Sequence, residues 1–205
     1  MGHRWSIRGF ATSAVLHIGR APAVALLILS WIALFPFAGR AQKEVPLEYR
    51  VKATFLYNFT KFVTWPPESF PSEDSALKIT VVGEDPFGPV LDELAYSTPG
   101  RGRKLVIERR NWNQDLRRCH VLFISRSEKR HLNAIHFNIK GASILTVSDL
   151  EQFSAAGGMI GFVFDGEQVR FEINLNAASQ ARLEISSRLL TLAASVRQQS
   201  DPLAN

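Results

Sequence analysis

The side chains that most often perform catalysis or bind metals are few in this sequence of 205 residues, and their spacing forms no recognised reactive set. His120 stands alone, and His131 and His136, five residues apart, do not share a helix face or form an HExxH site. Ser125 and Ser127 follow an apolar run without the GxSxG turn of a nucleophilic serine. We therefore predict that the protein is not an enzyme and holds neither a metal ion nor a cofactor.

The single cysteine, Cys119, excludes an internal disulfide and a thiolate cluster for a metal. It begins the apolar run Cys-His-Val-Leu-Phe-Ile, which favours a buried thiol that packs as a small apolar side chain. A redox or intermolecular role is the alternative.

A turn with two glycines, Gly83-Glu-Asp-Pro-Phe-Gly88, follows a predicted strand and precedes a predicted helix. α/β sheets hold ligands at such positions. The segment has neither the dinucleotide-binding pattern nor the P-loop pattern, so we interpret it as a tight turn.

A row of polar residues alternates with apolar ones along the segment 168–174. Arg170, Glu172 and Asn174 would share one face of a strand there. With Arg188, the side chains of Arg170 and Asn174 form a candidate small-molecule-binding site. The alternative is an Arg–Glu pair that satisfies itself at a solvent-facing surface.

The elements that position these residues alternate between strand and helix. Apolar residues at helical spacing predict a first helix over 48–63. Short apolar runs predict four strands, and helical spacing between them predicts two further helices. The strands are expected over 77–82, 104–109, 119–125 and 143–147, and the helices over 86–95 and 128–138.

The C-terminal part of the chain has a different pattern. Asp165-Gly166 separates two apolar segments, 159–164 and 168–174, and predicts a hairpin. The spacing of apolar residues from Ala181 to Val196 predicts a long final helix over 177–197. The fold class is therefore α/β: a mixed, largely parallel sheet flanked by helices on both faces, with an antiparallel hairpin near the C-terminus and a long C-terminal helix.

The first 41 residues have the pattern of a secretory signal peptide. They contain four arginines and no acid, an uncharged apolar run over 23–35, and small residues at Gly39 and Ala41. The apolar run is shorter than the about 20 residues that span a membrane. We expect cleavage after Ala41, export to the periplasm and a single domain over 42–205. An uncleaved membrane anchor is the alternative.

Removal of this segment changes the charge of the protein. The whole chain has 24 basic and 19 acidic side chains and a net charge of +5. Because the signal segment holds four of the arginines and no acid, the mature chain is nearly neutral. A nearly neutral domain gives little support for nucleic-acid binding.

Seven segments of the sequence, in order, resemble the YfiR family, and together they span about residues 50–197. The segments are Val51-Lys-Ala-Thr-Phe-Leu-Tyr-Asn-Phe-Thr-Lys-Phe-Val-Thr-Trp-Pro66, Gly83-Glu-Asp-Pro-Phe-Gly88, Cys119-His-Val-Leu-Phe-Ile-Ser125, Leu145-Thr-Val-Ser-Asp149, Gly157-Gly-Met-Ile160, Val169-Arg-Phe-Glu-Ile-Asn-Leu175 and Ile185-Ser-Ser-Arg-Leu-Leu190.

The resemblance implies a periplasmic regulator without known catalysis. It implies that the protein binds and represses the periplasmic part of an inner-membrane diguanylate cyclase, lowers cyclic di-GMP and forms a homodimer. The membrane would be contacted only through this partner. Some family members form disulfides, which the single Cys119 of this chain does not support.

Tyr57 and Trp65 are the candidate partner-binding residues. They belong to the aromatic-rich first helix and the turn after it, and we expect both rings to face outward. Burial of the rings in the core is the alternative. A stand-alone periplasmic small-molecule sensor, or an accessory protein of another signalling system, is the competing function, and it would use the site at Arg170, Asn174 and Arg188.

Overall fold

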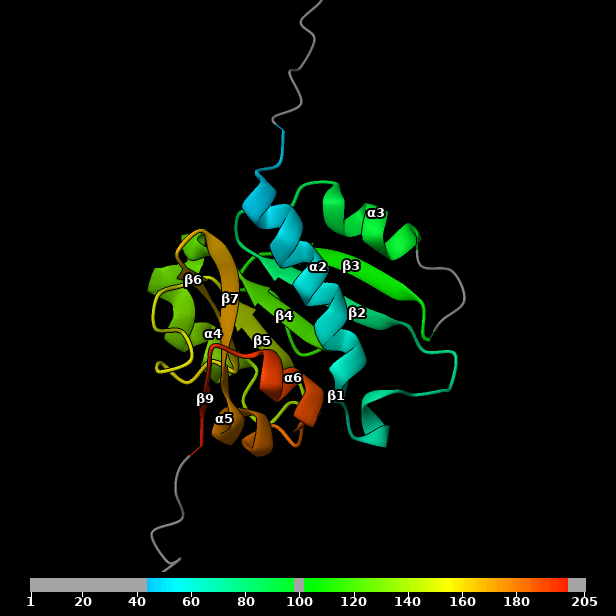
Figure 1. Cartoon of the computed structure of the whole chain (residues 1–205). Helices are drawn as coiled ribbons and strands as arrows, with labels where there is room; N and C mark the ends of the chain where they lie inside the picture. The colour runs from blue at the N-terminus through cyan, green and yellow to red at the C-terminus, as the bar shows by residue number, and fades with distance from the viewer. Residues whose placement is uncertain (1–43, 98–101, 199–205) are drawn as a thin grey trace, which may run out of the picture. The chain divides into compact units, whose positions relative to one another are not determined.

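A mixed sheet forms the centre of the part of the chain that the computed structural model describes, residues 44–97 and 102–198 (Figure 1). These residues belong to a unit that begins at Glu44, and the predicted signal peptide over 1–41 lies outside the described residues. In chain order, the strands of the sheet are β2 (Leu77–Val82), β3 (Leu105–Arg110), β4 (Val121–Ile124), β5 (Leu145–Ser148), β6 (Ile160–Asp165), β7 (Gln168–Asn174) and β9 (Ser195–Arg197).

The strands lie side by side in the order β3-β2-β4-β5-β6-β7-β9. The pairs from β3 to β6 are parallel, β6 and β7 are antiparallel, and β7 and β9 are parallel. β6 and β7 form the predicted hairpin, and Gly166 in its turn has the positive φ of +60° that such turns require. The largely parallel sheet and the hairpin are therefore confirmed.

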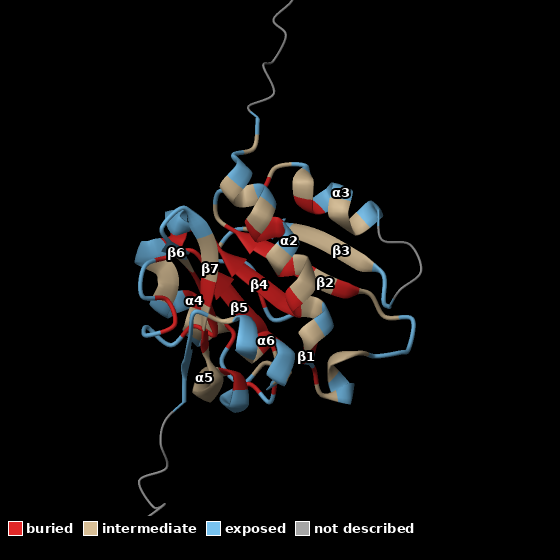
Figure 2. Cartoon of the chain, in the orientation of Figure 1, coloured by how far each residue is buried: buried red, intermediate tan, exposed pale blue. Residues whose placement is uncertain are grey.

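Helices cover both faces of the sheet. Val121 and Phe123 of β4 point to one apolar cluster, and Leu122 and Ile124 point to another, because successive strand residues face opposite sides. The first cluster includes residues of α2 (Leu47–Phe62), α3 (Val90–Tyr96), α5 (Leu175–Gln180) and α6 (Ser187–Leu192). The second includes Ile135 of α4 (Leu132–Asn138). β4 and β5 are buried between these layers (Figure 2).

Short elements connect this framework. β1 (Val63–Thr64) follows α2 directly and pairs antiparallel with β8 (Glu184–Ile185). Two 3₁₀ helices, η1 (Pro67–Ser69) and η2 (Arg126–His131), lie in the connections before β2 and after β4. Within the described part of the chain, no helix is both long enough and apolar enough to span a membrane.

The prediction of a long helix over 177–197 is wrong. α5 ends at Gln180, and Arg182 has a φ of +59°, which interrupts a right-handed helix. Ser186 then begins a separate helix, α6, because its Oγ accepts a hydrogen bond from the backbone N–H of Leu189.

After α6 the chain becomes extended and adds β9 to the sheet beside β7. Two side chains of the stripe that predicted one helix, Leu192 and Val196, are 55% and 39% exposed. Pairing with β7 satisfies backbone groups of this segment that a helix would have satisfied internally. The local apolar spacing carries no information about that distant strand.

Candidate functional site

A cavity of about 680 Å³ lies where the C-terminal half of α2 meets β1, the following turn and the first residues of β2 and β3. We call it the aromatic pocket. Its walls include aromatic and apolar side chains with two cations among them: Tyr57, Lys61, Trp65, Phe70, Arg103 and Leu105. Its volume falls within the range of ligand and anchor-residue pockets. The structure thus brings together Tyr57 and Trp65, the two predicted partner-binding residues.

The cations of the aromatic pocket lie over aromatic rings. Lys61 Nζ is 4.1 Å from the centroid of the Tyr57 ring, and the Arg103 guanidinium is 4.0 Å from that of Phe70. Arg103 also donates hydrogen bonds to the carbonyls of Ser72, at 2.9 Å, and Ser75, at 3.2 Å. This arrangement combines apolar walls with a charged rim, which is the usual anatomy of a protein-binding surface.

Trp65 does not face outward as we expected. Its side chain is only 7% exposed, and its indole N–H donates to the backbone carbonyl of His120 at 3.2 Å. Tyr57 is half-buried. Tyr57 is therefore accessible to a partner at the pocket, whereas Trp65 forms part of the wall that supports it.

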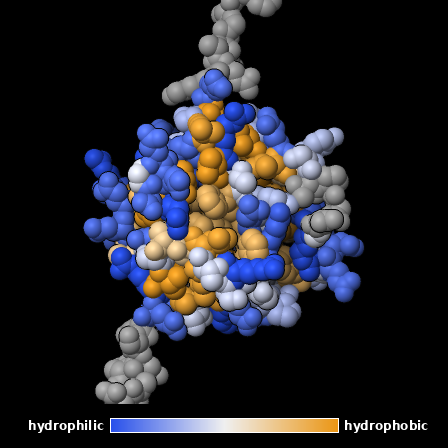
Figure 3. Space-filling view, in the orientation of Figure 1, coloured by the Kyte–Doolittle hydropathy of each residue, from blue (hydrophilic) through white to orange (hydrophobic). Residues whose placement is uncertain are grey.

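Apolar side chains extend beyond the pocket on the face that carries α2 and α6. Figure 3 shows that they gather over these two helices and that hydrophilic side chains surround them. Leu47 at the start of α2 is 75% exposed, and Leu192 at the end of α6 is 55% exposed. Exposed apolar area of this kind is typical of interaction surfaces.

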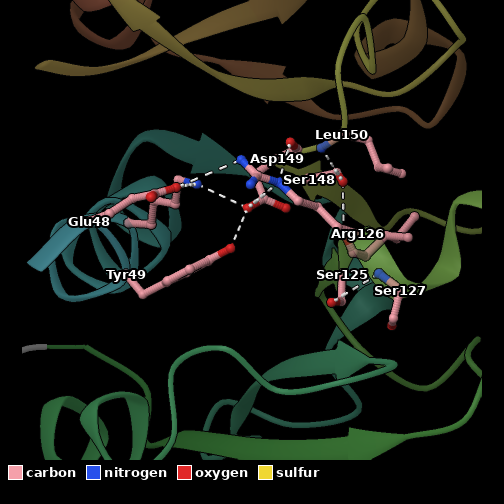
Figure 4. A network of polar contacts seen from close by, with 10 residues as sticks. Glu48, Tyr49, Ser125, Arg126, Ser127, Ser148, Asp149 and Leu150 are labelled. Carbon is pink, nitrogen blue, oxygen red and sulfur yellow. Dashed lines mark hydrogen bonds and ion pairs between the residues drawn. The ribbon is translucent and has the colours of Figure 1, made fainter. Parts of the chain in front are cut away.

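A group of ionisable residues around the buried Lys52 and Asp149 lies at the other end of α2, over the carboxyl ends of β4 and β5 (Figure 4). We call it the ionic cluster: Glu48, Tyr49, Lys52, Arg126 and Asp149. Lys52 Nζ donates to Asp149 Oδ2 at 2.9 Å and also to Glu48. The Tyr49 hydroxyl donates to the same Asp149 oxygen at 2.9 Å, and Arg126 Nε lies 3.1 Å from it.

The ionic cluster is electrically balanced, with two cations against two carboxylates. Desolvation and the neighbouring Asp149 carboxylate raise the pKa of Tyr49 to about 12, so its hydroxyl stays protonated and serves as a donor. Because each charge has a partner, the geometry is that of a clamp between α2 and the sheet and not that of a reactive centre.

The place where α/β sheets usually hold ligands is filled by the protein itself. The chain passes from β2 to β3 on one side and then to β4 on the other, so the carboxyl ends of β2 and β4 form the topological switch point. Gly83, with φ +89°, follows β2 there, and a Cβ on it would lie 2.3 Å from Ser127 Oγ. Ser127 Oγ accepts the backbone N–H of Glu84 at 3.0 Å. This contact agrees with the interpretation of the Gly83 segment as a tight turn.

The described residues give little support for a metal site or for a reactive thiol. None of their His, Cys, Asp and Glu side chains form a group of three or more that could hold a metal ion. Cys119 is 7% exposed, and burial raises the pKa of its thiol to about 12. The thiol is therefore protonated at neutral pH, and its protonated form is not the nucleophile.

The family of this chain follows from its match to a family model. A family model described as YfiR/HmsC-like matches residues 49–194. The chain belongs to this family. The resemblance noted in the sequence is thereby confirmed, and the YfiR/HmsC-like family supports, at family level, a periplasmic regulator of diguanylate cyclase signalling.

Solved structures agree on the fold of this YfiR/HmsC-like chain. It is similar to the crystal structure of a conserved domain protein from Vibrio cholerae O1 biovar El Tor strain N16961, with a TM-score of 0.51 and 14% sequence identity. The similarity covers 73% of this chain and 60% of the Vibrio chain, so it reaches less than two thirds of the latter. No curated protein matches the sequence.

Two of the YfiR-like segments meet in the ionic cluster. Lys52 comes from the first segment, on α2, and Asp149 ends the fourth, directly after β5. Sequence reasoning missed both residues. The available signal was a lysine on the apolar face of the first helix, in line with Leu56 and Phe59, which are both fully buried.

The three residues of the predicted small-molecule site are not brought together around the aromatic pocket. The side chain of Asn174 is engaged by the protein: Oδ1 accepts from Ala177 N at 3.1 Å, and Nδ2 donates to the Ser154 carbonyl at 2.8 Å. Asn174 thus caps α5. Arg170 lies half-buried on β7, and Arg188 is exposed on α6. Their ligand-binding role remains a prediction.

Proposed function

We propose that this protein is a periplasmic repressor that binds the periplasmic part of an inner-membrane diguanylate cyclase and lowers cyclic di-GMP. Membership of the YfiR/HmsC-like family over residues 49–194 carries this proposal. The balanced ionic cluster and the closed switch point agree with a protein that acts by binding.

Repression requires a preference between two states of the cyclase. A protein shifts such an equilibrium only by binding the inactive conformation more tightly than the active one. A shift from about 99% active to about 99% inactive requires a difference in affinity of about 10⁴. A shaped pocket with an aromatic wall supplies more of this discrimination than a flat polar surface, since aromatic anchors in pockets dominate binding energies.

We place the contact at the aromatic pocket and the apolar face beside it. Tyr57 is the proposed anchor residue, because it is half-buried, lines the pocket and carries Lys61 over its ring. Trp65 has an indirect role, because its buried indole supports the pocket wall.

Recovery of the partner tests the function. The full chain, carrying an affinity tag at its C-terminus, is purified from a solubilised cell envelope, and bound proteins are identified by mass spectrometry. We expect a membrane protein with a diguanylate cyclase output domain. Deletion of the gene raises cellular cyclic di-GMP, and expression from a plasmid restores the original level. An unchanged cyclic di-GMP level in the deletion strain contradicts repression.

A pair of tyrosine substitutions tests the placement. Tyr57→Ala weakens cyclase binding by about 30-fold, the factor that corresponds to about 2 kcal/mol for an anchor residue. Tyr96→Ala is the matched control, because Tyr96 is 91% exposed on α3 and does not line the pocket. Equal binding by the two variants, both folded by circular dichroism, places the contact elsewhere.

Export and self-association are parts of the same proposal. N-terminal sequencing of the periplasmic protein is expected to show a start after Ala41, whereas a start at Met1 indicates a retained anchor. Sedimentation equilibrium is expected to give twice the mass of the mature chain, as a homodimer requires.

A further inference from the structure

A second cavity, of about 560 Å³, lies at the amino ends of β2, β4 and β5. We call it the basic pocket, and its charged side chains are Lys78, Arg117, Arg118, Arg182 and Glu68. It shares no lining residue with the aromatic pocket. Leu77 lines the aromatic pocket and Lys78 the basic one, so the two cavities lie on opposite faces of β2.

The cations of the basic pocket come from separate parts of the chain. Lys78 is on β2, Arg117 and Arg118 precede β4, and Arg182 follows α5. In the sequence, Arg117 and Arg118 are neighbours, whereas Lys78 and Arg182 stand apart from other basic residues. The fold brings four such side chains around one cavity with a single carboxylate, Glu68, among its lining residues.

The nearby carboxylates leave the basic pocket with positive charge. Lys78 pairs with Glu108 at 3.2 Å, and Arg118 pairs with Asp115 at 3.2 Å. The guanidinium of Arg117 has no carboxylate partner in the described part of the chain, whereas its backbone N–H donates to Asp115 Oδ1 at 3.0 Å. Its guanidinium donates to the carbonyls of Asn138 and Lys140, at 3.2 Å each. Neutral carbonyls position this guanidinium without cancelling its charge.

Two of the cations are free to turn toward a ligand. The side chains of Arg118 and Arg182 are 80% and 60% exposed, and exposed ion pairs such as Arg182–Glu68, at 2.6 Å, contribute little to stability. Arg182 also donates to the hydroxyl of Ser143 at 3.4 Å, so a hydroxyl donor lies beside it. If Arg182 pairs with a bound anion in place of Glu68, the stability of the fold therefore decreases only slightly.

The histidine that lines the basic pocket is held by hydrogen bonds and is uncharged. His120 accepts the backbone N–H of Lys78 at Nδ1, at 3.0 Å, and Nε2 donates to the Ser69 carbonyl at 3.1 Å. Its ring stacks on Phe70 with centroids 4.4 Å apart. Burial lowers the pKa of His120, so the ring stays neutral and holds the strand end in place without taking part in charge pairing.

We infer that the basic pocket is a binding site for a phosphate-bearing anion, such as a phosphate monoester or a pyrophosphate. Guanidinium groups match phosphate oxygens with paired hydrogen bonds, and three of the four cations are arginines. The volume of the pocket suits an organic phosphate within the usual size range of ligand sites. This site is independent of the proposed contact with a cyclase.

Calorimetric titration of the full chain with pyrophosphate and with glycerol 3-phosphate tests the site. Sodium chloride at equal ionic strength is the reference. The pocket variant is Arg118→Gln with Arg182→Asn, since asparagine tolerates the left-handed backbone at position 182. The charge-matched control is Lys129→Gln with Arg130→Gln, on η2 at the opposite end of β4. Arg118→Gln alone is a second pocket variant, in which the backbone at position 182 is untouched.

We expect the anions to bind the parent protein and the control alike, and to bind the double pocket variant at least 10-fold more weakly. Absence of binding above the chloride reference overturns the inference, and so does an equal loss in pocket variant and control, which would indicate only a general charge effect. Vesicles of phosphatidylglycerol and of phosphatidylcholine distinguish the source of the phosphate. Retention on the former alone, lost in the pocket variant, indicates a lipid headgroup, whereas binding of the soluble phosphates alone indicates a free ester.

Discussion

Lys52 and Asp149 form an ion pair in the interior of the protein, with Nζ and Oδ2 2.9 Å apart and side chains 0% and 1% exposed. They are 97 positions apart in the sequence. Lys52 is on α2 and Asp149 follows β5, so the pair fixes the first helix over the carboxyl end of the sheet. The same helix carries Tyr57 to the aromatic pocket, and the position of that pocket therefore depends on this clamp.

Replacement of Asp149 by asparagine is expected to lower the free energy of unfolding by about 3 kcal/mol. The change leaves the buried Lys52 with only the partly exposed Glu48 as its counter-charge, and broken buried pairs cost about 3–5 kcal/mol. Urea denaturation measures the effect. Asp74→Asn, the same change at an exposed residue, should alter stability by no more than about 0.5 kcal/mol. A loss below about 1 kcal/mol for Asp149→Asn would show that the clamp is dispensable.

The stability of the protein should fall in alkaline solution because of Cys119. Burial raises the pKa of its thiol from 9.0 to about 12. Above pH 9 the unfolded chain releases this proton and the folded chain retains it, so the free energy of unfolding decreases between pH 9 and 12 and is unaffected by the thiol below pH 9. Each pH unit is worth about 1.4 kcal/mol at most.

Cys119→Ala tests this dependence. Urea midpoints at pH 8 and pH 10.5 should differ less in the variant than in the parent protein, because the remaining loss comes from other groups such as Tyr49, whose pKa is raised to about 12. Identical pH dependence in the two proteins would mean that the thiol is not desolvated in the folded state.

Asn174→Ala is expected to destabilise the protein by about 1–2 kcal/mol, because it removes the cap of α5 and leaves the Ser154 carbonyl without its donor. Asn174→Asp, which keeps the capping oxygen, should lose less. Thermal unfolding followed by circular dichroism provides the measurement. Arg170→Gln serves as the comparison within the same polar row, and we expect a change within about 0.5 kcal/mol. Full stability in Asn174→Ala would show that neither hydrogen bond of this side chain stabilises the fold.

Gly158→Ala is expected to cost about 1–3 kcal/mol through overpacking, since a Cβ at this position would lie 2.2 Å from the ring of Phe153, which is 1% exposed. Combination with Phe153→Leu should cost less than the sum of the two single changes, because the smaller side chain makes room for the methyl group. If urea denaturation shows that the losses in free energy of unfolding are strictly additive, the two positions do not compete for space.

Strands and the first helix could be predicted because their signals are local. Short apolar runs mark β2 and β4, and a turn glycine marks the β6–β7 hairpin. The prediction over 177–197 is wrong although it rests on the same kind of local signal. The apolar spacing of this segment fits one helix, but the positive φ of Arg182 and the pairing of β9 with β7 divide it into shorter elements. Of the residues proposed for partner binding, Tyr57 is half-buried at the aromatic pocket, and Trp65 is buried.

The sequence by itself determined the α/β class, the hairpin and membership of the YfiR family, because these depend on local periodicity and on the order of short segments along the chain. Only the tertiary structure decided which charges are compensated and which cavities form. Lys52 meets Asp149, and Lys78, Arg117 and Arg182 come to line one cavity, although they belong to distant segments. Such contacts depend on how strands are ordered in the sheet, and no neighbouring residue in the sequence records that order.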